Sequence, residues 1–427
     1  MKKTLLIGLL VVYSGLLSGQ QKPFEVDLKA DSKVLMTDSI QSAIDRCAAA
    51  GGGIVRFNEG IYLTGGIQLK SKVTLHLEKG VVLQGSDKYT DYKNDAFIYG
   101  RDISEIAIEG EGAIDGVDCY NPKGEEGFRG PHCIKLINCR NIKIEGIKIE
   151  NSANYAINCR HCSLGIVTNV TIHGGHDGLH TRFCDNFTVT GCDFRTGDDS
   201  FAGNDNRDFF ISDCKINTSC NGFRMGCYNL TVKHCELWGP GEYSHKIQNR
   251  NNMLSAFVHF SPKDENPKLL SGNWLIEDCT VDKVDNFYNY NFMDGLWQTG
   301  QPVTSIRFNK IKATGLLKAF SVTGDEERQL QLTIKNSTFA FREGSVTQNT
   351  AFEGAKLASD AFMYISDFGL VDLENVTLRK TGKNVLFECK SGNKLVLSGL
   401  HPDSALSVNS LKDIRQIKMR ENNDEKY

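Results

Sequence analysis

Three polar residues in the middle of the chain recur at one interval. Asp177, Asp199 and Asn221 are each 22 residues apart, and Asp198 directly precedes Asp199. If the chain repeats its structure at this interval, three carboxylates lie close together. Like charges at such distances raise the pKa of at least one carboxyl group, so that one residue type supplies both an acid and a base. Such a pair of carboxyl groups is what hydrolysis of a glycosidic bond requires.

The apolar residues keep the same interval, which indicates that the repeat is structural. Two apolar columns follow it with spacings of 22 and 21 residues: Phe187, Phe209 and Leu230, and Val189, Ile211 and Val232. A repeat of this length, with one short strand that cannot bury its apolar face alone, indicates a solenoid of stacked coils. Residues one repeat apart in a parallel β-coil lie about 4.8 Å apart. The spacing therefore predicts direct contact between the acidic residues.

Basic and amide side chains surround the acids in the same register. A second column contains His180, Ala202 and Arg224, and His176 directly precedes Asp177. A later segment adds His245 and Lys246, with Arg250 as a further candidate contact. We predict Asp177, Asp198 and Asp199 as catalytic residues. The predicted substrate-binding residues are His176, His180, Asn221, Arg224, His245 and Lys246.

Other interpretations of the acids stay open at this level. Asp and Asn are common at solenoid turns, where they bond to their own backbone, and an acidic column can bind calcium. The in-register group favours catalysis, and we predict neither a metal nor a cofactor. Asp198 and Asp199 would point to opposite faces of a regular strand, so both reach one groove only if Gly197 allows a bend.

Length, charge and the first residues limit the possible classes of protein. The chain has 427 residues and a formal net charge of −3, which provides no basic field for nucleic acid. Residues 1–19 have the basic start and short apolar stretch of a secretory signal. No later segment approaches ~20 apolar residues, so we expect no membrane insertion. We predict a secreted or periplasmic protein whose oligomeric state the sequence leaves open.

The rest of the chain divides by pattern. Residues 20–60 form an N-terminal segment with one amphipathic helix near 37–50, which we expect to cap the solenoid. Residues 61–410 contain short alternating strands separated by Gly, Asn and Asp, which predicts an all-β solenoid. A polar insertion around 241–269 interrupts them, and residues 411–427 read as a charged tail that frays.

The fourteen cysteines recur partly at the coil interval. Cys139, Cys162 and Cys184 form one series, and a second follows from Cys192 through Cys214 to Cys235. They are expected to be small buried side chains stacked along the core, although neighbours in register are close enough for some disulfides. A CxxC pair with a second matching pair is missing, so we expect no structural zinc site.

At these residues the sequence resembles the polygalacturonase family, the family 28 glycoside hydrolases. Thr37–Ser86 is similar to the family's cap and first coils, and Ile108–Gly116 resembles its Gly-Gly-Thr-Ile-Asp-Gly stretch. Asp177 matches the aspartate of its Asn-Thr-Asp motif, and Asp198-Asp199 matches its Gly-Asp-Asp motif. The resemblance implies a single-stranded right-handed parallel β-helix. It also implies an inverting hydrolase in which Asp198 is the general acid, while Asp177 and Asp199 position and activate water.

The sequence departs from the family at three motifs. Gly175-His176 replaces the Asn-Thr that precedes the first aspartate, and Cys220-Asn221-Gly222 replaces Gly-His-Gly. The family's Arg-Ile-Lys, which binds the substrate carboxylate, has no clear match. Ser244–Ile247 lies near the expected coil in a different order, and Arg224 is an alternative source of positive charge.

Three functional hypotheses follow. The first is an exported glycoside hydrolase, with inversion, acting on a pectin-related or other acidic polysaccharide or oligosaccharide. The second is a β-helix polysaccharide lyase or uronate epimerase, for which His176, His180 and Arg224 would supply the base and the positive charge. The third is a non-catalytic glycan-binding solenoid, favoured by Asn221 in place of the family histidine. Aromatic residues that would wall a sugar groove are Tyr288, Tyr290, Phe292 and Trp297.

Overall fold

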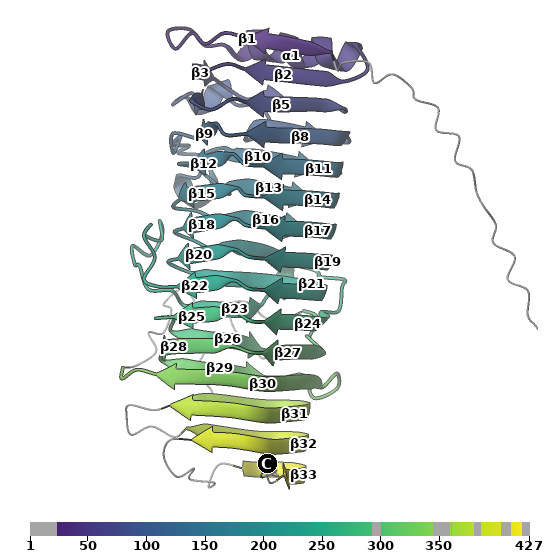
Figure 1. The fold of residues 1–427 in the computed structure, drawn as a ribbon, viewed down its shortest axis with the longest axis vertical. Helices are drawn as coiled ribbons and strands as arrows, with labels where there is room; N and C mark the ends of the chain where they lie inside the picture. The colour runs from purple at the N-terminus through teal and green to yellow at the C-terminus, as the bar shows by residue number, and fades with distance from the viewer. Residues whose placement is uncertain are drawn as a thin grey trace, which may run out of the picture.

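The computed structural model describes residues 24–292, 300–344, 359, 361–379, 386–402 and 411–420. Within these residues β-strands are the main secondary structure, wound into a stack of coils with one α-helix at its amino-terminal end (Figure 1). Neighbouring coils pair in parallel throughout the stack. The described part of the chain is therefore a parallel β-helix, with the right-handed winding that parallel crossovers adopt. The predicted fold class is confirmed.

Three parallel ladders run along the stack. The first contains β1 (Glu25–Leu28), β2 (Gly53–Phe57), β5 (Val73–Leu77), β8 (Ser104–Gly110), β11 (Arg140–Glu145), β14 (Ser163–Thr168), β17 (Asp185–Thr190), β19 (Phe201–Ser212), β21 (Asn221–Lys233), β24 (Gly272–Glu277), β27 (Ser305–Asn309), β30 (Leu330–Phe341), β31 (Met363–Arg379), β32 (Phe387–Pro402) and β33 (Leu411–Arg420). The second contains β3 (Gly60–Thr64), β6 (Val81–Gly85), β9 (Ala113–Asp115), β12 (Lys148–Glu150), β15 (Thr171–Gly174), β18 (Asp193–Thr196), β20 (Lys215–Thr218), β22 (Glu236–Trp238), β25 (Thr280–Asp282) and β28 (Lys312–Leu316), followed by the end of β30. The third contains β4 (Ile67–Gln68), β7 (Ala96–Arg101), β10 (His132–Ile137), β13 (Ile157–Arg160), β16 (Leu179–Arg182), β23 (Ser255–His259), β26 (Asn286–Asn291) and β29 (Lys318–Thr323), joined by the beginnings of β19, β21, β31 and β32.

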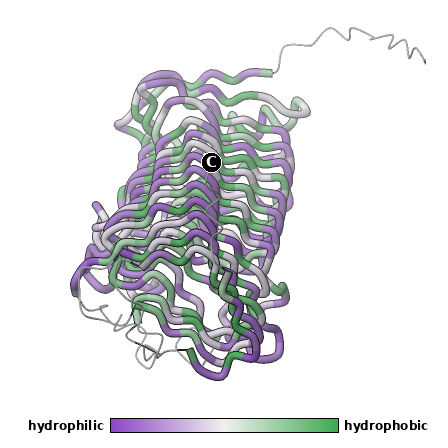
Figure 2. The backbone as a smooth tube through the Cα atoms, turned by 60° about the horizontal axis from the view of Figure 1, so that its bottom comes forward, coloured by the Kyte–Doolittle hydropathy of each residue, from purple (hydrophilic) through white to green (hydrophobic). Residues whose placement is uncertain are grey.

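The interior of the coils is filled by apolar columns that continue from coil to coil. Figure 2 shows residues of like hydropathy in line along the stack. In the first ladder Phe187 pairs with Phe209, which pairs with Leu230, as the 22-residue spacing predicts. In the third ladder Phe201 stacks on Phe223 with ring centroids 4.7 Å apart. Each ring is excluded from water by the coils on both sides, so packing of these columns fixes the register.

The helix α1 (Thr37–Ala49) covers the amino-terminal end of the stack (Figure 1). Its buried face consists of Ile40, Ala43, Ile44 and Cys47, and the helix packs against β1, β2, β4 and β5. The first coil would otherwise expose its apolar interior. The helix lies where the amphipathic pattern predicts it.

Two segments differ from the sequence predictions. Within the predicted insertion at 241–269, Ser255–His259 forms β23 and pairs with β21 and β26. Two loops therefore replace one insertion, at 239–254 and 260–271. The predicted charged tail at 411–427 begins with β33, which pairs with β32, and Leu411 and Ile414 pack against the hydrophobic core. The predicted signal at 1–19 lies outside the described residues.

All fourteen cysteines are buried and none is in a disulfide, as expected for small core side chains. Many of them donate to the carbonyl oxygen two residues earlier, for example Cys162 to Arg160 and Cys184 to Arg182, both at 3.4 Å. In the part of the chain that the structure describes, no helix has the length and apolar character needed to span a membrane.

Candidate active site

A pocket of about 380 Å³ lies over the middle coils and contains most of the predicted site residues. Its floor is formed by the turns that lead into β16, β19 and β21. Its walls come from loop residues 116–131 after β9, from the 239–254 loop after β22, and from the 260–271 loop after β23. The pocket thus combines residues from the repeating coils with residues from three loops that do not repeat.

The predicted carboxylates meet on the floor. One oxygen from each of Asp177, Asp198 and Asp199 lies within 4.8 Å of the other two. The backbone sets this approach, because Gly178 N donates to Asp199 O at 2.9 Å and Ser200 N donates to Asn221 O at 3.0 Å. The second predicted column, His180 over Ala202 over Arg224, is paired as expected. The predicted register is confirmed.

Asp198 and Asp199 both reach the pocket because they lie in a turn between β18 and β19. Gly197 begins this turn, where a Cβ atom would lie 2.4 Å from Ser244 O and 2.6 Å from Gly175 O. Thr196 and Thr218 both donate their hydroxyl groups to Asp198 O. Glycine is required here by close approach of neighbouring backbone, and the threonines then hold the turn.

Asp199 is buried and both of its oxygens are occupied. Oδ1 accepts from Asn221 Nδ2 at 2.8 Å and from Asn221 N at 3.2 Å, while Oδ2 accepts from Arg224 Nη1 at 3.0 Å. Burial raises the pKa of Asp199 to about 6, although the Arg224 charge opposes the shift. Arg224 is itself covered by Phe260, whose ring centroid lies 3.6 Å from the guanidinium carbon.

Asp177 is also buried, and His180 Nδ1 is hydrogen-bonded to its Oδ2 at 2.9 Å. The Tyr155 ring lies parallel to the His180 ring with centroids 4.3 Å apart, which fixes the imidazole. Burial and the nearby Asp198 charge raise the pKa of Asp177 well above its ordinary value. Burial and the Arg224 charge lower the pKa of His180 to about 4. In the substrate-free site these shifts favour a proton on Asp177 and a neutral His180.

Asp198 is the most accessible of the three, with 17% of its side chain exposed against 5% for Asp177 and 2% for Asp199. Asp199 N donates to its Oδ1 at 3.0 Å, His245 Nε2 lies 3.6 Å from Oδ1, and Arg129 Nη2 lies 3.5 Å from Oδ2. Burial alone would raise the pKa of Asp198, but His245 and Arg129 outweigh it and the pKa lies well below its ordinary value.

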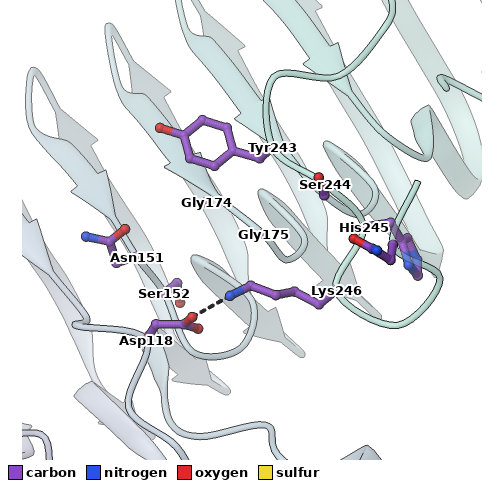
Figure 3. A pocket seen from close by; sticks show the side chains of 10 residues that line it. Asp118, Asn151, Ser152, Gly174, Gly175, Tyr243, Ser244, His245 and Lys246 are labelled. Atoms are coloured by element: carbon purple, nitrogen blue, oxygen red, sulfur yellow. Dashed lines mark hydrogen bonds and ion pairs between the residues drawn. The ribbon is translucent and has the colours of Figure 1, made fainter. Parts of the chain in front are cut away.

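Two predicted substrate-binding residues lie outside this pocket. The His176 ring is buried beside Phe128, with centroids 5.9 Å apart, and burial lowers its pKa to about 3. Lys246 lines a neighbouring pocket of about 330 Å³, where it forms an ion pair with Asp118 (Figure 3). His245 lines both pockets. Of the six predicted contacts, four therefore line the pocket that contains the acids: His180, Asn221, Arg224 and His245.

The predicted aromatic wall is wrong for two of its members. Tyr288 and Tyr290 are fully buried in the core, because their alternation in β26 turns both rings inward. Phe292 is partly buried against the core, and Trp297 lies outside the described residues. The aromatic side chains that do line the pocket are Tyr155 and Phe260.

Sequence reasoning did not identify Arg129, which sits on the wall loop after β9. Its guanidinium binds Glu126 Oε2 at 2.6 Å and Asp198 at 3.5 Å, and lies 5.7 Å from the Tyr155 ring centroid. Residues 116–131 lack the alternation of apolar and polar residues that the strands on either side show. This missing alternation is the one sequence signal that could have indicated the loop.

Two groups of side chains have the composition of cation ligands. They are the three aspartates, and Asp198 with Cys220 and His245. Arg129 and Arg224 already face Asp198 and Asp199, and Arg250 Nη2 lies 3.7 Å from Cys220 Sγ. Protein cations thus compensate the negative charge, so the arrangement favours acid–base chemistry over ion binding.

Comparison with known proteins shows a family similarity over part of the chain. Residues 56–226 match the family model described as glycosyl hydrolases family 28. The chain is 30% identical over 153 residues to an exo-poly-alpha-D-galacturonosidase of Dickeya chrysanthemi, an alignment that covers 30% of this chain and 25% of that protein. It is 24% identical over 260 residues to an endo-polygalacturonase of Pectobacterium carotovorum subsp. carotovorum, covering 50% of this chain and 64% of that protein. Residues 56–226 are therefore similar to glycosyl hydrolase family 28.

The structural similarity to known proteins extends beyond the residues that match the family model. A hyperthermoactive exopolygalacturonase from Thermotoga maritima superposes with a TM-score of 0.66 at 19% identity, covering 84% of this chain and 94% of that one. The family match ends at residue 226, before the 239–254 loop that supplies His245 and Arg250. The 260–271 loop, which supplies Phe260 and Glu265, also follows residue 226, so two of the three wall loops lie outside the match.

Proposed function

We propose that this chain is a member of glycosyl hydrolase family 28 and an exported glycoside hydrolase that cleaves glycosidic bonds in a pectin-related or other acidic polysaccharide or oligosaccharide, with inversion. The observation that carries the proposal is the group of three carboxyl groups within 4.8 Å of one another, lining one pocket and differing in the direction of their pKa shifts. Such a division between protonated and ionised carboxyl groups supplies the acid and the base for hydrolysis.

The three aspartates act as one unit that holds a proton. Burial favours the proton on Asp177, whereas the family resemblance assigns the acid to Asp198. The carboxyl groups of Asp177 and Asp198 are close enough to titrate together, so the proton is shared between these two residues. Asp198 donates it to the leaving oxygen, since it has the most exposed carboxyl group. Asp199, ionised above about pH 6, holds the water and accepts its proton.

The bonding of Asp199 favours inversion over retention. A retaining enzyme uses one carboxylate as a nucleophile that forms a bond to the sugar. Asp199 has both oxygens bound by Asn221 and Arg224, and Asp177 is bound by His180, so both are placed to hold water. Oxygen atoms of the three aspartates lie within 4.8 Å of one another. The two carboxyl groups of an inverting enzyme are typically farther apart, at ~6.5–9.5 Å. The anomer of the first product therefore tests this part of the proposal.

The other two hypotheses have less support in the site. A lyase or epimerase needs a free base for a carbon-bound proton. His176 lies outside the pocket, His180 is bound to Asp177, and Arg224 is bound to Asp199. A non-catalytic solenoid is favoured by loss of the family histidine, but Asn221 instead donates to Asp199, and the carboxylates stay together.

The decisive experiment incubates the chain without residues 1–19 with a panel of pectic oligosaccharides and follows the products by proton NMR. The proposal expects a new reducing end whose first-formed anomer is opposite to that of the cleaved bond. An unsaturated product that absorbs in the ultraviolet would establish a lyase, and binding with no product across the panel would establish a glycan-binding solenoid. Export is tested separately, by sequencing the amino terminus of the mature protein.

A further inference from the structure

A second pocket of about 330 Å³ lies beside the pocket that contains the acids, and the 239–254 loop lines both (Figure 3). His245 belongs to both linings, whereas Asp177, Asp198 and Asp199 line only the first pocket. The volume of the second pocket is within the ~300–1,000 Å³ range of small-molecule sites. The proposed hydrolysis makes no use of this second pocket, so its lining is examined for a ligand of its own.

Small residues leave the floor of the second pocket open. Gly174, at the end of β15, lines it together with Gly175 and with Ser152 of the preceding coil. Within 4 Å, a Cβ atom on Gly174 would meet only the backbone nitrogens of Asn151 and Ser152, both at 3.7 Å, which is ordinary contact. The floor therefore has room for an added methyl group, and a ligand can approach the peptide backbone closely there.

The charged side chains of the second pocket compensate each other. Lys246 forms an ion pair with Asp118, and among the described residues no other Lys, Arg, Asp or Glu lines this pocket. His245 Nδ1 accepts a hydrogen bond from Gln248 N at 3.1 Å, and its Nε2 lies 3.6 Å from Asp198 in the first pocket. The lining thus offers no uncompensated charge to an anion, which favours a neutral ligand over a carboxylate or a phosphate.

An aromatic ring and two polar groups remain available to such a ligand. Among the described residues, the Tyr243 hydroxyl and the Asn249 side-chain amide form no hydrogen bond with the protein. The Tyr243 ring is partly exposed and lies beside His173, with centroids 5.9 Å apart. Figure 3 shows this ring across the pocket from the Lys246–Asp118 pair. A sugar suits this lining, because its C–H face packs on an aromatic ring while its hydroxyl groups pair with amide and hydroxyl groups.

We propose that the second pocket is a carbohydrate-binding site that takes one neutral sugar unit. The inference rests on the proposed function only for its general class of ligand, since the lining itself favours a neutral, hydroxyl-rich molecule. Because His245 lines both pockets, a sugar bound here lies next to a polysaccharide bound over the acids. Two sources have this chemistry: a neutral branch on the substrate chain, and a separate neutral sugar.

Direct binding tests the site without any catalytic turnover. The probe is methyl β-D-galactopyranoside, titrated against the chain and followed by saturation-transfer NMR. We expect saturable binding, which Tyr243→Ala should weaken by roughly 3- to 10-fold, the range for loss of one ring contact. Gly174→Ala should weaken the binding as well, because its methyl group occupies part of the floor.

Tyr120→Ala is the matched control. Tyr120 lies on the 116–131 loop and is 62% exposed, but it does not line the second pocket, so its removal should leave the affinity for the probe unchanged. The two pocket variants change opposite features, since one removes a wall and the other fills the floor, so misfolding of either one leaves the other as a test. Absence of saturable binding, or equal affinity in Tyr243→Ala and Tyr120→Ala, would overturn the proposal.

A pair of substrates distinguishes the two sources of the sugar: a linear galacturonic acid oligosaccharide, and the same oligosaccharide with one neutral galactose branch. If the sugar is a branch of the substrate, Tyr243→Ala raises KM for the branched substrate relative to the linear one, and Tyr120→Ala leaves this ratio unchanged. If the sugar is a separate molecule, the ratio stays constant in both variants while the probe still binds. A chain that hydrolyses neither substrate would contradict the proposed function alone, because the binding experiment needs no hydrolysis.

Discussion

The carboxylates on the floor of the pocket and the cations on its walls come from two kinds of chain segment. Asp177, Asp199 and Asn221 are fixed by the ladder, because each occupies the same place in successive coils. Arg129 and Arg250 lie on loops that do not repeat, and each is held by individual bonds to nearby groups. The floor therefore inherits the rigidity of the solenoid, while the walls depend on a few local contacts. We infer that chemistry resides in the floor and substrate choice in the walls.

Removing the proposed proton donor, Asp198, from the floor should have the largest effect. We expect Asp198→Asn to lower kcat by roughly 10²- to 10⁴-fold on a natural oligosaccharide, the range for loss of general acid–base catalysis. A nitrophenyl glycoside of the same sugar has a leaving group that needs little protonation, so the variant should recover most of its rate on that substrate. Stopped assays of both substrates measure the difference.

The same pair of substrates identifies which carboxyl group donates. Asp199→Asn removes the proposed base, so the nitrophenyl glycoside should not restore the activity of this variant. If the rescue occurs in Asp177→Asn and is missing in Asp198→Asn, the acid role moves to Asp177, where the substrate-free electrostatics favour the proton.

The rings beneath the floor support it through packing alone. Phe201 follows the acid turn and is buried between Phe194 and Phe223, at centroid distances of 4.9 and 4.7 Å. We expect Phe201→Ala to reduce the free energy of unfolding by about 3–5 kcal/mol, through lost contacts and the cavity left behind. Phe210→Ala on the same strand is the control, because 41% of Phe210 is exposed and its loss should cost about 1 kcal/mol or less. Denaturant titrations that give equal costs would contradict this account of the core.

This contrast also explains what the sequence can and cannot predict. The columns through Phe209 and Arg224 follow from a constant interval, because parallel pairing converts that interval into contact. The loop residues do not recur at a constant spacing. Nothing in the sequence therefore indicates that Arg129 contacts Asp198 or that Lys246 pairs with Asp118.

Strand pairing also overrides composition at two places. Residues around β23 and β33 read as polar or charged, yet a neighbouring coil offers an open edge with unpaired backbone groups. β23 also contains Ala256, Phe257 and Val258, and it pairs with a coil on each side, β21 and β26. The insertion and tail predicted from composition were therefore too long.

Substitution of Arg224 tests whether a cation on the floor of the pocket lowers the pKa of the proposed base, Asp199. Its guanidinium lowers the pKa of Asp199, which burial has raised to about 6. Asp199 must be ionised to accept a proton, so kcat/KM should fall as the pH drops through about 6. In Arg224→Gln the pKa of Asp199 should rise further, and the acid limb of the profile should move to higher pH by roughly 1–3 units. A lower rate with an unmoved acid limb would show that Arg224 does not control this carboxyl group.

The smallest effect is expected where the two wall loops meet. Lys246 and Asp118 join the 239–254 loop to the 116–131 loop (Figure 3), but 36% and 48% of their side chains are exposed. Exposed pairs contribute little, so Lys246→Ala should change the free energy of unfolding by less than about 1 kcal/mol. Each loop keeps its own bonds to the solenoid, including Arg250 to Ser219 and Arg129 to Asn154. The double variant with Asp118→Ala should then match the single variants, and a large additional loss would mean that the walls form one cooperative unit.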